Sequence, residues 1–141
     1  MKAGSWTFTG NGFSVRVRCD QGARRRIEDA WVVQVDAPFG GRPVGLFGVF
    51  DGLGGEPKGD VAARTASTDL VGVVGRVSSV SDILTRLNDA VLSKGGYTTA
   101  VVAIISPDGE VQLAHVGDSG AFLLADGAVK LLTERDTAPN G

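Results

Sequence analysis

The sequence has little of what would mark a secreted, membrane-bound or nucleic-acid-binding protein. A single cysteine, Cys19, cannot form an internal disulfide. The formal net charge of -2 provides no broad basic field for nucleic acid or an anionic membrane, although the arginines at 24–26 form a local cationic cluster. The N-terminus lacks an apolar segment resembling a signal peptide or a transmembrane span. We therefore expect a cytoplasmic protein that binds neither nucleic acid nor membranes.

The remaining composition is that of a soluble globular domain. The chain has 141 residues, of which 43% are hydrophobic and 21% charged, and this balance argues against a disordered chain. A chain of this length can bury one hydrophobic core. We therefore expect residues 1–141 to form a single domain, without an internal repeat or an interdomain linker.

Three strands are predicted in the first half of the sequence. Residues 13–18 alternate between apolar and polar side chains, which is typical of a half-buried strand. Residues 30–35 and 44–50 form two further apolar runs, and the second is nearly continuous, as in a strand covered on both faces. The glycines and prolines at 37–43 predict a turn-rich connection between these two strands.

Two helices are predicted in the middle of the sequence. From about residue 60 onward, apolar side chains recur at helical spacing, at positions 62, 66, 70, 73 and 77. Residues 79–96 repeat this pattern more clearly, with Ser81 as a candidate N-cap and Gly95 as the residue that ends the helix. We expect these two helices to pair and to cover a sheet.

The last third of the sequence is again rich in strands. Short apolar runs at 98–105, 111–119, 121–125 and 128–132 predict consecutive antiparallel strands. The order of strands, a helix pair and further strands indicates an α+β domain with helices packed on antiparallel sheets. Residues 133–141 are expected to form a loop.

The sequence contains three Asp-Gly pairs, at Asp51, Asp108 and Asp126. Two of them are interpreted as ordinary turns and one as part of a candidate site. The pairs at Asp108 and Asp126 each join two short apolar runs, which predicts tight hairpins with positive φ. Asp51-Gly52 instead leads from a predicted strand through Leu53 and further glycines into a predicted helix. Glycine lets a backbone approach a ligand and leaves carbonyls accessible. A plain turn is therefore the weaker interpretation at Asp51.

Acidic residues lie at the ends of three predicted strands. Glu28 and Asp29 precede one strand, Asp51 closes the next, and Asp118 closes a third. A carboxylate at the end of a buried strand loses its hydration unless a cation neutralises it. Magnesium and manganese prefer hard oxygen ligands such as carboxylates and carbonyls, and the carbonyl of Gly52 suits this chemistry. Together these acids predict a divalent metal site.

Five motifs follow one another along the chain: RRRIEDAWVV, GLFGVFDGLGG, GYTTAVVAII, VQLAHVGDSGAFLL and VKLLTERDT. Together and in this order they resemble the metal-dependent serine/threonine protein phosphatases, known as the type 2C or PPM family, from about Gly12 to the last residue. The resemblance implies an antiparallel β-sandwich flanked by helices, with two Mn²⁺ or Mg²⁺ ions at one edge. It also implies a phosphoprotein substrate.

The resemblance assigns roles to individual residues. Asp51 matches the acid that bridges both ions, Gly52 a carbonyl ligand, and Glu28 an acid that reaches an ion directly or through water. Arg24 matches the arginine that holds the substrate phosphate, and Asp118 matches the acid of a further metal site. The implied reaction is an in-line phosphoryl displacement by a metal-activated water.

The chain departs from the family pattern at several positions. Leu53 stands where many members carry a histidine that protonates the leaving group, and Gly120 replaces the usual arginine after GDS. The only histidine, His115, lies within a predicted strand and is interpreted as a packed sheet residue. Arg25 and Arg26 are interpreted as solvated loop charges. Two later acidic ligands of the family have no counterpart, so the resemblance implies a phosphatase domain lacking its C-terminal part.

Three interpretations of function remain open. The chain hydrolyses phosphoserine or phosphothreonine in proteins, or it is a non-catalytic phosphatase-like module that binds a partner, or it is an inactive fragment of a longer phosphatase. Missing strands would leave exposed sheet edges, and such edges pair with other chains. We therefore expect a homo-oligomer formed through those edges.

Overall fold

The computed structural model describes residues 2–53 and 58–134. Residues 54–57, which contain the glycines after Leu53, and the predicted loop beyond residue 134 lie outside the described residues. The helices and strands of the described part are β1 (Gly4–Gly10), β2 (Phe13–Cys19), β3 (Asp29–Phe39), β4 (Arg42–Asp51), α1 (Gly59–Val73), the 3-10 helix η1 (Val74–Arg76), α2 (Val80–Lys94), β5 (Ala100–Ile105), β6 (Val111–Val116), β7 (Phe122–Ala125) and β8 (Ala128–Leu131).

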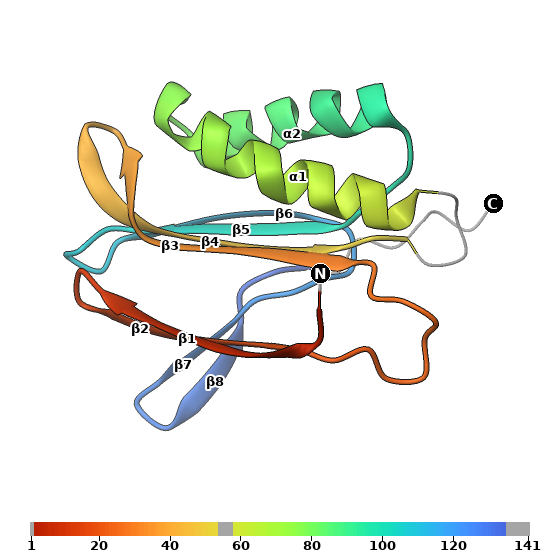
Figure 1. Ribbon diagram of the computed structural model, residues 1–141. Coiled ribbons are helices and arrows are strands. Elements are labelled where there is room, and N and C mark those ends of the chain that lie inside the picture. The colour runs from red at the N-terminus through yellow and green to blue at the C-terminus, as the bar shows by residue number, and fades with distance from the viewer. Residues whose placement is uncertain (1, 54–57, 135–141) are drawn as a thin grey trace.

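These elements form layers (Figure 1). The central sheet has the strand order β3-β4-β5-β6, and each neighbouring pair is antiparallel. Helices α1 and α2 lie together over one face of this sheet, and the antiparallel hairpins β1-β2 and β7-β8 lie on its other side (Figure 1). The predicted α+β class, an antiparallel β-sandwich flanked by helices, is confirmed.

The main hydrophobic core lies between the helices and the central sheet. Alternate residues of β4 point into it, and Leu46 and Phe50 are fully buried there. Leu70 of α1 and Ile83 of α2 belong to the same buried cluster. Burial of each such side chain contributes about 1.5–3 kcal/mol, so this contact holds the helix pair on the sheet. The prediction that the two helices pair and cover a sheet is confirmed.

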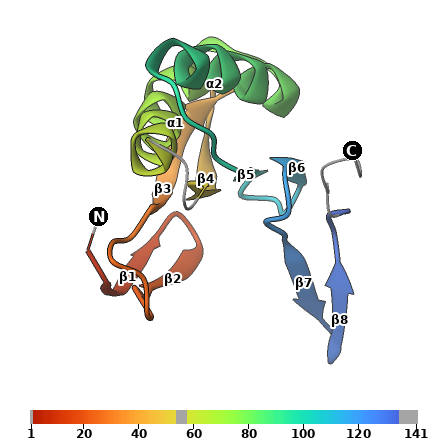
Figure 2. The same cartoon turned by 90° about the vertical axis from the view of Figure 1, so that its right-hand side faces the viewer.

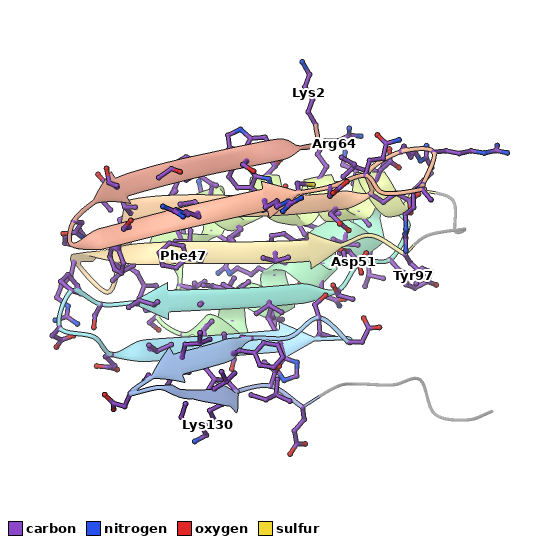
Figure 3. The ribbon with its side chains drawn as sticks, turned by 90° about the horizontal axis from the view of Figure 1, so that it is seen from below. Lys2, Phe47, Asp51, Arg64, Tyr97 and Lys130 are labelled. Atoms are coloured by element: carbon purple, nitrogen blue, oxygen red, sulfur yellow. The ribbon has the colours of Figure 1, made fainter. Side chains whose placement is uncertain are left out.

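The second layer of the sandwich is divided between two hairpins. Trp6 and Phe8 of β1 pack on Trp31 of β3, with ring centroids 5.0 and 5.7 Å apart. Phe13 of β2 packs on Phe47 of β4, with ring centroids 5.6 Å apart. The β7-β8 hairpin lies over the opposite margin of the sheet, and β4 and β5 run between the two hairpins (Figure 2, Figure 3). Aromatic packing anchors β1-β2, whereas every residue of β7 and β8 is exposed.

Strand β1 was not predicted from the sequence, although its partner was. The predicted strand at 13–18 is confirmed as β2, which extends to Cys19. In β1 only Trp6 and Phe8 are large apolar residues, and glycine, serine and threonine surround them. This strand is stabilised by pairing with β2 along its whole length and by contact with Trp31. Neither interaction leaves a pattern in the local sequence.

The predicted turn-rich connection at 37–43 is wrong. β3 continues to Phe39 and β4 begins at Arg42, so Gly40 and Gly41 alone form the turn, with φ of 62° and 77°. Pro38 and Pro43 lie opposite each other within the strands. β3 is an edge strand, and β4 pairs with β5 only from Gly45 onward. Neither proline therefore removes a hydrogen bond that the sheet needs.

The ends of the helices differ in part from the prediction. Ser79, not Ser81, is the N-cap of α2, and its hydroxyl accepts a hydrogen bond from the N–H of Asp82 at 3.1 Å. Ser81 lies within the first turn, where it cannot cap. Gly95 ends α2 with φ 82°, as predicted. Val77 lies beyond η1 in extended conformation. In residues 2–53 and 58–134, no helix has the length and apolar character needed to cross a membrane.

One of the two predicted tight hairpins is confirmed. Asp126 and Gly127 both have positive φ, 52° and 76°, and join β7 to β8. Asp108 and Gly109 also lie in a turn between antiparallel strands, as predicted, but only Gly109 has positive φ, so the tight form predicted there is wrong. The loop there is longer, because the hydroxyl of Ser106 hydrogen-bonds Asp108 and also accepts from the N–H of Glu110.

Candidate metal centre

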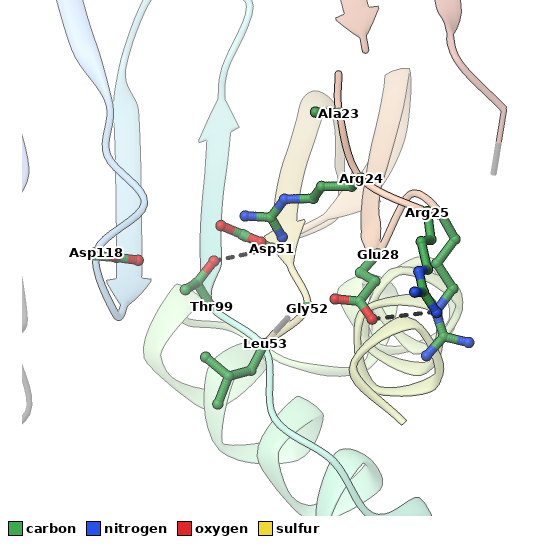
Figure 4. Close-up of a pocket in the computed structure, with 10 residues that line it drawn as sticks. Ala23, Arg24, Arg25, Glu28, Asp51, Gly52, Leu53, Thr99 and Asp118 are labelled. Carbon is green, nitrogen blue, oxygen red and sulfur yellow. Dashed lines mark hydrogen bonds and ion pairs between the residues drawn. The ribbon is translucent and has the colours of Figure 1, made fainter. Parts of the chain in front are cut away.

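The candidate site forms where strand ends meet at one edge of the central sheet. β3 begins, β4 ends and β5 begins at this edge, and the segment after β6 returns to it, because neighbouring strands are antiparallel. An open pocket of about 940 Å³ lies there. Its lining includes all five predicted site residues (Figure 4), namely Arg24, Glu28, Asp51, Gly52 and Asp118.

Asp51 and Asp29 face each other across β4 and β3. They are register partners, and their carboxyl groups share a hydrogen bond. Partial burial, this hydrogen bond and the negative charge of Asp29 raise the pKa of Asp51 to about 6. The charge of Arg24 opposes this rise, and that of Asp118 adds to it. The pocket thus concentrates negative charge that a cation would neutralise.

Two residues of the site were given no role of their own from the sequence. Asp29 was counted among the acids at strand ends, and its position opposite Asp51 depends on the register of β3 and β4. Thr99 also lines the pocket, just before β5. The available signal for Thr99 was its place at the start of an apolar run, at the same sheet edge as the acids.

Close backbone contacts fix the end of β4 at Gly52. Its N–H donates to the carbonyl of Glu28 at 3.1 Å. A Cβ at this position would lie 2.2 Å from the carbonyl oxygen of Gly59 and 2.5 Å from that of Glu28. Only glycine lets these three backbone segments meet so closely. The first turn of α1 and the start of β3 therefore pack directly against the end of β4.

An arginine of the preceding loop holds Glu28. Arg26 Nε lies 3.3 Å from Glu28 Oε1, and its guanidinium lies 3.8 Å from a carboxylate oxygen of Asp60 in α1. The Glu28 side chain is only 10% exposed. The Arg26 side chain remains 59% exposed, so the interpretation of a solvated loop charge holds, and this charge pairs with two acids. Arg25 is exposed at the pocket, as a loop charge would be.

Arg24 extends into the pocket from the loop between β2 and β3 (Figure 4). Its guanidinium points toward Asp51, and Asp118 lies beyond Thr99 on the other side of the pocket (Figure 4). A guanidinium and several carboxyl groups thus surround one open space. Such a space can bind a phosphate through the arginine and a cation through the acids.

The oxygen atoms in the pocket suit Mg²⁺ or Mn²⁺. Magnesium in proteins is commonly held by one or two carboxylates and several waters, and Asp51, Glu28 and the carbonyl of Gly52 provide oxygens of this kind. The described residues contain no group of three or more acidic, histidine or cysteine side chains that could hold a metal ion. A cation held by these few oxygens would therefore have to keep much of its water shell.

The described pocket lining contains no histidine. Leu53, which the sequence resemblance placed where many members carry a histidine, lines the pocket and is 49% exposed. His115 lies in β6 opposite Val101, and its Nδ1 is buried. It is therefore a packed sheet residue, as interpreted from the sequence.

Proteins with related sequences are protein phosphatases. The chain is 29% identical over 144 residues to the probable protein phosphatase 2C 59 of Oryza sativa subsp. japonica. This alignment covers 94% of the chain and 43% of the relative. It is 36% identical over 129 residues to the probable protein phosphatase 1N of Homo sapiens. This alignment covers 81% of the chain and 29% of the relative. No family model matches the chain.

Solved structures with a similar fold are also phosphatases. A bacterial serine phosphatase superposes with a TM-score of 0.65 at 22% identity, over 96% of this chain and 55% of that one. A serine/threonine phosphatase from Staphylococcus aureus superposes with a TM-score of 0.61 at 21% identity, over 96% of this chain and 54% of that one. The fold is thus that of a protein phosphatase.

The sequence relatives narrow this class. Together with the motif order, they bear out the sequence resemblance, because the chain is similar to type 2C protein phosphatases over most of its own length. The chain spans less than half the length of the two sequence relatives.

Proposed function

We propose that this chain binds Mn²⁺ or Mg²⁺ and hydrolyses phosphoserine or phosphothreonine in proteins. The observation that carries the proposal is the gathering of Arg24, Glu28 and Asp51 in one open pocket at the strand ends. Similarity to type 2C protein phosphatases supports the same reaction class. The raised pKa of Asp51 supports a cation as its partner, because a divalent charge would favour the ionised carboxylate.

Each pocket residue has a proposed role. Asp51 and Glu28 hold two divalent cations, the carbonyl of Gly52 is a further ligand, and Asp118 serves an additional cation site. When bound, such cations activate a water and neutralise charge on the phosphoryl oxygens. Arg24 binds the phosphate through charge-assisted hydrogen bonds, and its planar guanidinium allows two of them at once.

Hydrolysis of p-nitrophenyl phosphate with and without Mn²⁺ tests this proposal. We expect Mn²⁺-dependent turnover in the parent and its loss in Asp51→Asn. Arg24→Ala should keep its Mn²⁺ affinity but raise KM about 10-fold or more, because a charged hydrogen-bond donor is lost. Arg76→Ala is the matched control, because Arg76 is exposed at the end of η1 and does not line the pocket. If Asp51→Asn and Arg24→Ala both hydrolyse like the parent, the site assignment is wrong.

A second candidate is a non-catalytic module that binds phosphoproteins. Two observations favour it: the described residues contain no group of three metal-binding side chains, and Leu53 cannot donate a proton. Such a module would bind a phosphopeptide through Arg24 without turnover. Phosphopeptide binding by a folded protein that shows no hydrolysis would support this function. If the protein neither binds the phosphopeptide nor hydrolyses phosphate, the result would favour a chain that acts only as part of a longer phosphatase.

We also propose that the chain self-associates through strands of the second layer. The β7-β8 hairpin carries large apolar side chains that are exposed, among them Phe122, Leu124 and Val129. A two-stranded hairpin is only marginally stable in water by itself, and exposed strand edges pair with other chains. A second copy of this chain would cover both the exposed apolar side chains and the strand edges.

A further inference from the structure

We propose that Thr99 is a positioning residue that fixes the backbone of Asp51 and ties it to the segment carrying Asp118. The inference rests on the proposed function, because it concerns how the metal-binding acid is held in place. Its basis is a set of hydrogen bonds that joins the end of β4, the start of β5 and the turn after β6.

Thr99 binds both polar backbone groups of Asp51. The N–H of Thr99 donates to the carbonyl of Asp51 at 2.9 Å, and the N–H of Asp51 donates to the hydroxyl of Thr99 at 3.1 Å. In a regular antiparallel pair, two residues exchange two backbone hydrogen bonds. Here one of the two bonds ends on a side chain. The last residue of β4 therefore depends on a hydroxyl group at position 99.

The same hydroxyl reaches the segment after β6. Thr99 Oγ1 lies 2.5 Å from the Oγ of Ser119, the residue that follows Asp118. A hydroxyl has one hydrogen to donate and two lone pairs, so Thr99 can accept from Asp51 and share a hydrogen bond with Ser119 at the same time. In the pocket, Thr99 lies between Asp51 and Asp118 (Figure 4).

Close packing holds this segment against Thr99. Gly117 has φ 93°, and a Cβ there would lie 2.7 Å from Cγ2 of Thr99. Glycine therefore lets the turn after β6 approach the threonine methyl group. Branching at Cβ also restricts χ1 of Thr99. Shape and hydrogen bonding together direct the hydroxyl toward Asp51 and Ser119.

Two substitutions separate the hydroxyl from the methyl group. Thr99→Val keeps the shape and removes the hydroxyl, whereas Thr99→Ser keeps the hydroxyl and removes the methyl. Residues that orient metal ligands typically change metal affinity about 10- to 100-fold when replaced. We expect Thr99→Val to weaken Mn²⁺ binding about 10-fold or more, and Thr99→Ser about 3-fold or less.

The test uses the full chain and Mn²⁺ alone. Calorimetric titration gives the Mn²⁺ affinity, and NMR gives the hydrogen-exchange rate of the Asp51 amide in metal-free protein. We expect this amide to exchange faster in Thr99→Val than in the parent and to recover its protection in Thr99→Ser. Ser119→Ala should weaken Mn²⁺ binding less than Thr99→Val, because it leaves the bond to Asp51 intact. Thr85→Val, exposed on α2, is the control for the substitution itself.

Parent-like Mn²⁺ affinity and parent-like exchange of the Asp51 amide in Thr99→Val would overturn the proposal. If Thr99→Val does not fold, Ser119→Ala decides, and an unchanged Mn²⁺ affinity in that variant would overturn it. A parent that binds Mn²⁺ but hydrolyses no phosphate would refute the proposed phosphatase activity. The Mn²⁺ affinities and amide exchange rates of the Thr99 variants would still test the role of Thr99. A parent that binds no Mn²⁺ would refute both.

Discussion

Asp51 carries a carboxyl group whose ionisation opposes folding in the metal-free protein. Burial comes first among the causes that raise its pKa to about 6, followed by the hydrogen bond with Asp29 and the charge of Asp29. In the unfolded chain an aspartate has a pKa of about 3.9. Between these two values the folded state binds more protons than the unfolded state. Its stability must therefore decrease as pH rises through this range.

We expect the free energy of unfolding of the chelated protein to contain a component that falls as pH rises from about 4 to about 6. Asp51→Asn should remove this component and stabilise the metal-free protein above that range. Asp89→Asn, on the exposed face of α2, should leave the component in place. Urea unfolding in EDTA at several pH values measures it. A parent-like pH profile in Asp51→Asn would contradict the raised pKa.

Gly52 allows a contact between backbones that no other residue permits. We expect Gly52→Ala to destabilise the protein by about 2 kcal/mol or more, because its Cβ would lie 2.2 Å from the carbonyl oxygen of Gly59. Gly72→Ala in α1 is the matched control, since its Cβ would have no atom within 4 Å. That change should instead stabilise the helix by up to about 1 kcal/mol. Denaturant midpoints compare the two, and equal midpoints would refute the packing at Gly52.

At the scale of single elements, α2 depends on the cap at its first turn. We expect Ser79→Ala to cost about 1 kcal/mol, because the N–H of Asp82 loses its hydrogen-bond acceptor. Ser81→Ala should have little effect, since Ser81 lies inside the helix and its side chain is exposed. Thermal unfolding of both variants tests the assignment of the cap. A greater loss in Ser81→Ala than in Ser79→Ala would reverse it.

The elements that could be predicted from the sequence are those in which apolar residues recur with the period of a helix or a strand and mark the buried face. The apolar stripe of α2 and the alternation of β2 each report which face is buried. β1 could not be predicted in this way, because its stability comes from pairing with β2 and from contacts with Trp31. Likewise, Pro38 and Pro43 suggested a loop, but both lie where a strand needs no hydrogen-bond donor.

The site shows the same division between local and non-local information. The positions of Asp51 and Asp118 after apolar runs placed them at strand ends, and antiparallel pairing brings those ends to one edge. The contact between Asp29 and Asp51 depends on strand register, which the sequence does not state. The roles of Arg26 and Thr99 depend on side-chain contacts with distant residues. These roles could only be found in three dimensions.

At the scale of the whole molecule, the two faces of the central sheet are covered unequally. The helices bury one face in a continuous core, whereas two separate hairpins cover the other. Large apolar side chains on the β7-β8 hairpin remain exposed, with Leu124 at 73%. Exposed apolar patches of this kind commonly mark interaction sites. The hairpin is thus a part of the described surface where another chain could bury several large apolar side chains.

We expect the chain to sediment as a dimer or larger species at micromolar concentration, because association would cover β7 and β8. Leu124→Lys should shift it toward the monomer. Leu92→Lys is the matched control, since Leu92 is 65% exposed but lies on α2. Sedimentation velocity over a range of concentrations distinguishes these outcomes. A parent that is strictly monomeric would count against self-association, and an equal shift in both variants would count against the hairpin as its site.

The bonds of Thr99 also determine when the pocket can assemble during translation. Asp51 is bonded to a residue 48 positions later, and that residue is bonded to one 20 positions further on. Chains emerge from the ribosome N-terminus first. Arg24, Glu28 and Asp51 are therefore synthesised well before Thr99 and Ser119 can join them. A nascent chain that has released both helices already carries these acids and the arginine, yet it has no pocket until the turn after β6 emerges.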